Sequence, residues 1–168
     1  MAREIAEGIQ YLHSRPIPIS HNDLTPNNIL LDYESAPEGI LIRKVKISDF
    51  GLSLKLSSGT RKTAKLGGSE QYLPIEFLEE NQHSTKNDIW SFGCLLFYIF
   101  SGKQPWPKFT ESGSATKQIR LLENQISFFS ENPKLKEVEI SLIVQKCMVY
   151  DPEKRIKIQQ LISLLQSV

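Results

Sequence analysis

The stretch HNDLTPNN, residues 21–28, decides how this sequence of 168 residues is interpreted. It forms a polar loop directly before residues 29–31, an apolar ILL run that predicts a strand. Within the loop, Asp23 is followed five positions later by Asn28. Such a pair suits phosphoryl transfer, because a carboxylate can accept the proton of an attacking hydroxyl while an amide oxygen holds a divalent cation. A polar turn built from Asp, Pro and Asn accounts for the same residues equally well.

A second stretch, SDFG at residues 48–51, follows the predicted strand at residues 45–47. The carboxylate of Asp49 can bind Mg²⁺ through oxygen, and Gly51 allows a sharp turn of the backbone behind it. An Asp-Phe-Gly tripeptide alone arises by chance in many chains. Its distance of 26 residues from Asp23 makes it the second member of an ordered pattern.

Three further stretches continue this pattern toward the C-terminus: GSEQYLPIE at residues 68–76, DIWSFG at 88–93 and DPEKR at 151–155. In order and spacing, the five stretches resemble the motifs of eukaryotic-type protein kinases. Because they extend over nearly the whole chain, a chance match is a poor explanation. The resemblance implies an α+β, mostly α-helical domain over residues 1–168. This would be the C-terminal lobe of the protein-kinase fold, with small β-hairpins beside the catalytic loop, residues 21–28.

The resemblance also implies chemical roles, with ATP and Mg²⁺ as cofactors and a protein as substrate. Asp23 would be the catalytic base. Asn28 and Asp49 would hold Mg²⁺ against the phosphates of ATP. Ser69 would line the acceptor site near Asp23, and Leu30 would lie beneath the adenine ring.

Other motif residues are expected to support the structure. Glu76 and Arg155 should form a buried ion pair, since either charge would be very costly alone. Asp88 is expected to anchor the backbone of the catalytic loop through hydrogen bonds. His21 and Phe50 would stack in the apolar interior.

The sequence departs from the kinase pattern in four ways, of which the mildest is Pro74-Ile75-Glu76 in place of Ala-Pro-Glu, with Glu76 kept. It contains no Gly-x-Gly-x-x-Gly segment and no Val-Ala-x-Lys strand, so we expect the upper, ATP-gripping lobe to be missing from this chain. Asn22 stands where many kinases have an Arg that pairs with a phosphorylated residue. Thr25 is counted among the predicted catalytic residues. It occupies the position at which Ser/Thr kinases usually have a Lys that touches the γ-phosphate.

Three functions follow from this comparison. The first is a kinase that transfers the γ-phosphate of ATP to Ser or Thr hydroxyls of a protein. The second is a catalytically weak pseudokinase or scaffold, favoured by Asn22, Thr25 and the missing lobe. The third is the kinase part of a stress-sensor kinase/ribonuclease of the endoplasmic reticulum. The long connection at residues 32–44, the segment 68–70 and the C-terminal tail resemble that group of kinases.

Composition narrows the setting. A net charge of +1 gives no reason to expect a nucleic-acid partner. The longest apolar run, residues 89–100, is too short to cross a bilayer, so no membrane contact is expected from this segment. No signal peptide is visible, and Cys94 and Cys147 lie in apolar surroundings typical of buried reduced thiols. We therefore predict a cytoplasmic location, or the cytosolic face of a membrane if the parent protein is anchored.

Apolar periodicity predicts five helices, and polar stretches predict the connections between them. Asn87 or Asp88 should cap the second helix, and Gly102 follows its end. His13 and His83 show no pattern that suggests metal binding or catalysis, so surface or packing roles are expected for both. The predicted helices are residues 2–14, 89–100, 115–125, 135–149 and 156–166, with an exposed hairpin at 32–44 and a mobile loop at 55–70.

Overall fold

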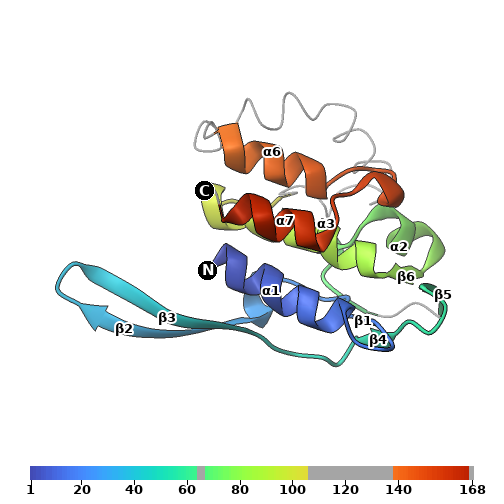
Figure 1. Cartoon of the computed structure of the whole chain (residues 1–168), viewed down its shortest axis with the longest axis horizontal. Coiled ribbons are helices and arrows are strands. Elements are labelled where there is room, and N and C mark those ends of the chain that lie inside the picture. Colours follow the sequence, from blue (N-terminus) through green and yellow to red (C-terminus); the bar gives the residue numbers. More distant parts are fainter. Residues whose placement is uncertain (64–66, 106–137, 167–168) are drawn as a thin grey trace.

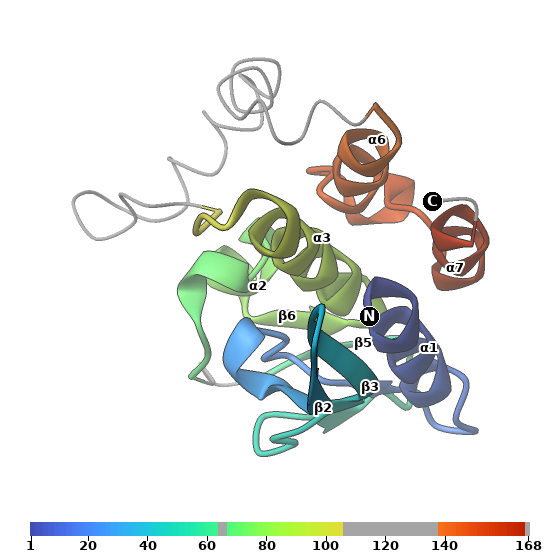
Figure 2. The same cartoon turned by 90° about the vertical axis from the view of Figure 1, so that its left-hand side faces the viewer.

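The computed structural model describes residues 1–63, 67–105 and 138–166. Within these ranges, helix α3 contacts α1 and α6, and α7 packs against α1 (Figure 1). A short helix, α2, lies near the N-terminal end of α3 (Figure 1). Figure 2, turned by 90°, shows the same grouping around α3. The helices are α1 (Ala2–His13), α2 (Ile75–Glu80), α3 (Thr85–Ser101), α6 (Val138–Cys147) and α7 (Ile158–Leu165).

The central helix α3 is apolar on nearly all sides, which is why it is buried. Trp90 and Phe92 are among its fully buried side chains. Ser84 caps its N-terminus, because the Ser84 hydroxyl accepts the N–H of Lys86 at 3.2 Å. The prediction of an Asn87 or Asp88 cap is therefore wrong, since residues 85–88 already form the first helical turn. Gly102 ends the helix in the left-handed conformation, as expected.

Three two-stranded antiparallel sheets lie in the described part of the chain. Strands β2 (Ile29–Ala36) and β3 (Gly39–Ile47) form a hairpin that projects from the helices (Figure 1). The exposed hairpin at residues 32–44 is thus confirmed, although it is longer than the small hairpins expected. The remaining pairs are β1 (Ile19–Ser20) with β4 (Leu54–Lys55), and β5 (Thr60–Lys62) with β6 (Gln82–Ser84).

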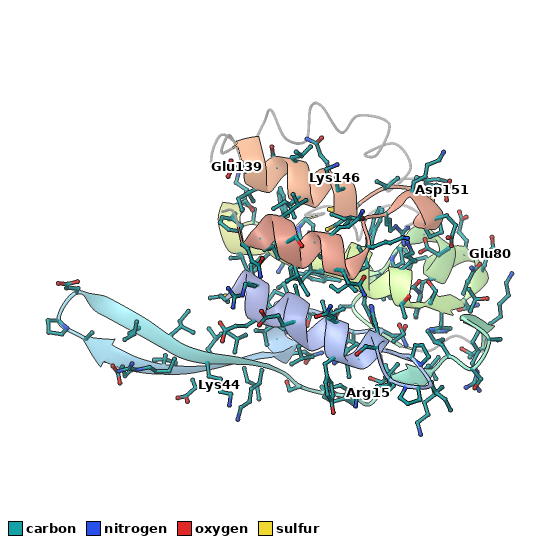
Figure 3. The ribbon with its side chains drawn as sticks, in the orientation of Figure 1. Arg15, Lys44, Glu80, Glu139, Lys146 and Asp151 are labelled. Carbon is teal, nitrogen blue, oxygen red and sulfur yellow. The ribbon has the colours of Figure 1, made fainter. Side chains whose placement is uncertain are left out.

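The base of this hairpin belongs to the core, whereas its far end does not. Val45 is buried, and the side chain of Ile47 lies against Gly8 of α1. Farther out, Tyr33 and Ile40 are largely exposed. Charged side chains on the rim, such as Lys44, point away from the core in Figure 3.

The other predicted elements have mixed outcomes. Helices α1, α6 and α7 confirm the predictions at residues 2–14, 135–149 and 156–166; α6 ends two residues earlier than predicted, α7 is shorter at both ends, and residues 135–137 lie outside the described part of the chain. The segment predicted as a mobile loop, 55–70, contains strand β5. The helix predicted at 115–125 lies outside the described residues. Among the helices described, none has both the length and the apolar character needed to cross a membrane.

Candidate active site

The carboxylate of Asp23 is held by hydrogen bonds to both of its oxygens. The side-chain amide of Asn28 donates to Asp23 Oδ2 at 2.9 Å and to the Asp23 carbonyl at 2.8 Å. The backbone N–H of Ser69 donates to Asp23 Oδ1 at 3.2 Å. Two segments far apart in the sequence therefore meet at one carboxylate, and its orientation is fixed from both sides.

The loop at residues 21–28 is anchored by hydrogen bonds to the buried carboxylate of Asp88. The backbone N–H groups of His21 and Asn22 donate to this carboxylate at 3.0–3.1 Å. His13 Nε2 lies 2.8 Å from Asp88 Oδ2, and the Ser20 hydroxyl oxygen lies 3.4 Å from Oδ1. The predicted anchoring role of Asp88 is confirmed, and the carboxylate links the loop to helix α1 as well.

Asp49 reaches the same region from the end of strand β3. The carbonyl of Asn28 accepts the backbone N–H of Ser48 at 2.9 Å and its hydroxyl at 3.1 Å. Asp49 has φ of 60°, and its Oδ1 accepts the N–H of Gly51 at 3.2 Å. Asn28 and Asp49 are thus tied together across the base of the hairpin.

An apolar contact supports this junction. The rings of His21 and Phe50 meet edge to face with centroids 5.0 Å apart, and His21 Nε2 lies 3.0 Å from the Ser48 carbonyl. The predicted contact between the two rings is confirmed, but the prediction that both stack in the apolar interior is wrong for Phe50, which is about half exposed. It holds the turn that carries Asp49 against the loop that carries Asp23.

The donor set at this junction fits a divalent cation that prefers oxygen ligands. Because the Asn28 amide group donates to Asp23, its Oδ1 is turned away from that carboxylate. Asp49 is exposed and offers carboxylate oxygens. Mg²⁺ is commonly held by one or two such side chains together with substrate phosphates and water. Asn28 and Asp49 are the residues that would hold it here.

A cavity of about 410 Å³ opens beside the catalytic loop; its wall begins at Thr25, two residues after Asp23, and does not include Asp23 itself. Thr25 and Ser69 both lie in its wall, so the structure brings these two predicted site residues together. The Tyr72 hydroxyl donates to Gln104 at 2.8 Å in the same wall, and burial raises the Tyr72 pKa well above its usual range. Leu30 does not line this cavity; it lies on β2 with about half of its side chain exposed.

A buried ion pair between Glu76 and Arg155 joins helix α2, which follows the cavity-lining residues 69–72, to the C-terminal part of the chain. Arg155 donates to Glu76 through two parallel hydrogen bonds of 2.5 and 2.9 Å. Arg155 also donates to the carbonyls of Lys86, Val149 and Tyr150. The predicted pair is confirmed, and its bidentate geometry explains why an Arg is needed.

Two histidines were missed as contributors to the site. His13 was expected to have a surface or packing role, yet it contacts Asp88 in the interior. His83 is also buried and contacts Asn22 and Thr63. No sequence pattern could have revealed either contact, because the partners lie between 20 and 75 residues away.

Comparison with known proteins agrees with this fold. The family model described as "Protein kinase domain" matches residues 1–164. The chain is 30% identical to an Aurora kinase of Debaryomyces hansenii over 95% of its own length and 35% of that protein. It is 29% identical to the "Serine/threonine-protein kinase CTR1" of Arabidopsis thaliana over 99% of its length and 19% of that protein.

This chain belongs to the protein kinase family. The predictions of family and of an α+β, kinase-like fold are thereby confirmed. The chain spans between about a fifth and about a third of the length of the two relatives above. The similarity to stress-sensor kinases is not tested by these relatives and stays a prediction.

Proposed function

We propose that this chain is the C-terminal lobe of a kinase that transfers the γ-phosphate of ATP to Ser or Thr hydroxyls of a protein. The observation that carries the proposal is the fixed carboxylate of Asp23, whose two oxygens accept from Asn28 and Ser69. Relatives named serine/threonine-protein kinases support the choice of acceptor. An upper lobe outside this segment would complete the ATP site.

In this mechanism, Asp23 receives the proton of the substrate hydroxyl while the hydroxyl oxygen bonds to the γ-phosphorus. The bond between that phosphorus and the β–γ bridging oxygen breaks, and ADP leaves. The hydrogen bonds from Asn28 and Ser69 keep the carboxylate pointed at the acceptor. Mg²⁺, held by Asn28 and Asp49, would neutralise charge on the phosphates.

The cavity beside the catalytic loop is where we place the acceptor segment of the substrate. Thr25 and Ser69 would contact it there, next to the base. Leu30, exposed on β2, would lie beneath the adenine ring. Asp49, which follows strand β3, would face the phosphates of ATP.

A catalytically weak kinase or scaffold is the second candidate, and the environment of Thr25 favours it. Only 3% of Thr25 is exposed, and the residue carries no charge. Removing one preorganised donor from a transferring group typically costs about 2.7–4 kcal/mol of transition-state stabilisation. Thr25→Lys tests this candidate, because a large gain in transfer rate would count against a role without chemistry.

The decisive experiment measures phosphate transfer from labelled ATP to a generic protein substrate by the full-length parent. Asp23→Asn should lower kcat by at least about a hundredfold, the usual contribution of a general base. Asp32→Asn is the matched control, since Asp32 lies exposed on β2 away from the cavity. Equal rates for the Asp23→Asn variant and the wild type would refute the proposed base.

A further inference from the structure

Three side chains form a series of hydrogen bonds between strand β5 and the catalytic loop; two of them, Asn22 and His83, are buried, and Thr63 is half-buried. Thr63, directly after β5, has its hydroxyl 2.9 Å from His83 Nε2. The other ring nitrogen, His83 Nδ1, lies 3.3 Å from Asn22 Oδ1. Asn22 immediately precedes Asp23, so this series of hydrogen bonds ends beside the proposed catalytic base.

The Asn22 side chain can adopt only one orientation in this place. Its amide group faces the carbonyls of Leu52 at 3.0 Å and Ser20 at 3.3 Å, which only accept hydrogen bonds. Its Oδ1 therefore faces the Ser20 hydroxyl at 2.8 Å and His83. These bonds also hold Asn22 at φ of 66°, a left-handed conformation that asparagine tolerates better than most residues.

The orientation of Asn22 fixes the tautomer of His83. Because Asn22 Oδ1 is an acceptor, His83 Nδ1 must carry the hydrogen. In a neutral ring, Nε2 is then an acceptor and takes the hydrogen of the Thr63 hydroxyl. Burial and the nearby charge of Arg61 lower the His83 pKa, which favours this neutral form.

His83 lies between Thr63 and the catalytic loop and is held rigidly in place, so a shift of one can move the other. The residue is completely buried, and its ring packs edge to face against Phe77 with centroids 4.6 Å apart. Strand β5 is paired with β6, the strand that contains His83, and Lys62 bonds to Glu80 beside them at 2.7 Å. Glu80, at the end of α2, is labelled in Figure 3.

We propose that His83 is a positioning residue that couples Thr63 to Asn22 and thereby holds the catalytic loop in place with neutral hydrogen bonds. The consequence for turnover rests on the proposed kinase function. A phosphate on Thr63 would remove the hydroxyl hydrogen that His83 accepts. This arrangement of the loop is therefore maintained by the unmodified Thr63 side chain.

The first test needs no activity. Long-range proton–nitrogen NMR spectra of the 168-residue chain report which ring nitrogen of His83 carries the hydrogen. We expect a protonated Nδ1 and an unprotonated Nε2 at neutral pH. The opposite tautomer would overturn the proposal, since Asn22 and Thr63 could not then both be bonded as described.

The second test compares Thr63→Val with Thr63→Ser and with Thr60→Val, a matched change at an exposed residue of the adjoining strand β5. Trypsin should cleave the Thr63→Val chain after Arg61 and Lys62 about twofold to tenfold faster than wild type, the range that one neutral hydrogen bond provides. Thr63→Ser and Thr60→Val should stay at the wild-type rate. Equal acceleration by Thr63→Val and Thr60→Val would overturn the coupling.

In the full-length parent, Thr63→Val should lower kcat with an unchanged KM for ATP, and Thr63→Ser should restore kcat. An unchanged kcat in an active parent would overturn the positioning role. If the parent transfers no phosphate while the tautomer and cleavage results are as expected, the proposed function fails and the structural coupling stands.

Discussion

His13 and Asp88, separated by 75 positions, meet with Nε2 and Oδ2 only 2.8 Å apart. His13 lies in the last turn of α1, and Asp88 lies in the first turn of α3. The Asp88 side chain is fully buried and that of His13 is 8% exposed. This contact joins two helices to the carboxylate that also receives the backbone of the catalytic loop, so the loop and the helical core share one anchor.

Removing the His13 donor should destabilise the fold. We expect His13→Leu to lower the free energy of unfolding by about 1–3 kcal/mol, because a buried carboxylate loses a partner. His13→Gln is the control, since its amide can still donate to Asp88. Urea titrations of the 168-residue chain measure both values, and equal midpoints for the two variants would contradict this expectation.

The Glu76–Arg155 pair should be far more sensitive on its Arg side. Arg155→Met strands a buried carboxylate and three carbonyls, so a loss of about 3–5 kcal/mol is expected. Glu76→Gln keeps an acceptor and should cost less. A double-mutant cycle from urea unfolding gives the coupling energy, and additive losses would show that the pair contributes nothing specific.

Stability should fall in mildly acidic solution because of His83. Its pKa in the folded chain lies below its ordinary value of 6.5, so below that pH the unfolded chain binds a proton that the folded chain does not. The loss is at most about 1.4 kcal/mol per pH unit, and it fades within about one pH unit above 6.5, where the unfolded histidine is neutral as well. Urea unfolding near pH 7.5 and 5.5 measures it. His83→Gln should show a smaller difference between the two conditions, and an unchanged difference would assign the effect to other groups.

The contact between α3 and α6 should not tolerate a methyl group at Gly93. A Cβ there would lie 2.7 Å from both Cys147 Cβ and Met148 Cγ, so the helices must shift. We expect Gly93→Ala to cost about 1–3 kcal/mol, as overpacking usually does. Gly8→Ala is the control: its Cβ would meet only the flexible end of Ile47, and the helix gains about 1 kcal/mol in propensity. Thermal unfolding should rank the two variants in that order, and the reverse ranking would refute the packing argument.

Contacts that follow from an ordered motif pattern could be predicted from the sequence. The Glu76–Arg155 pair and the Asp88 anchor are of this kind, because each joins two motifs. The prediction of the capping residue of α3 was wrong because Asn87 and Asp88 are helical and buried, and their side chains form hydrogen bonds to other groups. Polar residues at the start of an apolar run resemble a cap until their partners are known.

The strand length of the hairpin and the roles of the histidines could not be predicted. Residues such as Tyr33 and Ile40 face solvent at the far end of the ribbon, where neither face is covered, so no alternation of polar and apolar residues marks the strands there. His13 and His83 acquire their partners only through tertiary packing. Single histidines carry no spacing signal of their own.

The hairpin has one further consequence, which concerns how the chain can vary. The path from Asn28 to Ser48 runs through the whole ribbon, yet the two residues are bonded directly at its base. The separation of the proposed metal ligands is therefore independent of the number of residues in between. Insertions or deletions near Pro37 and Glu38, at the exposed turn, would change the reach of the ribbon and leave the site intact. Evolution can thus reshape this part of the surface without altering the chemistry beneath it.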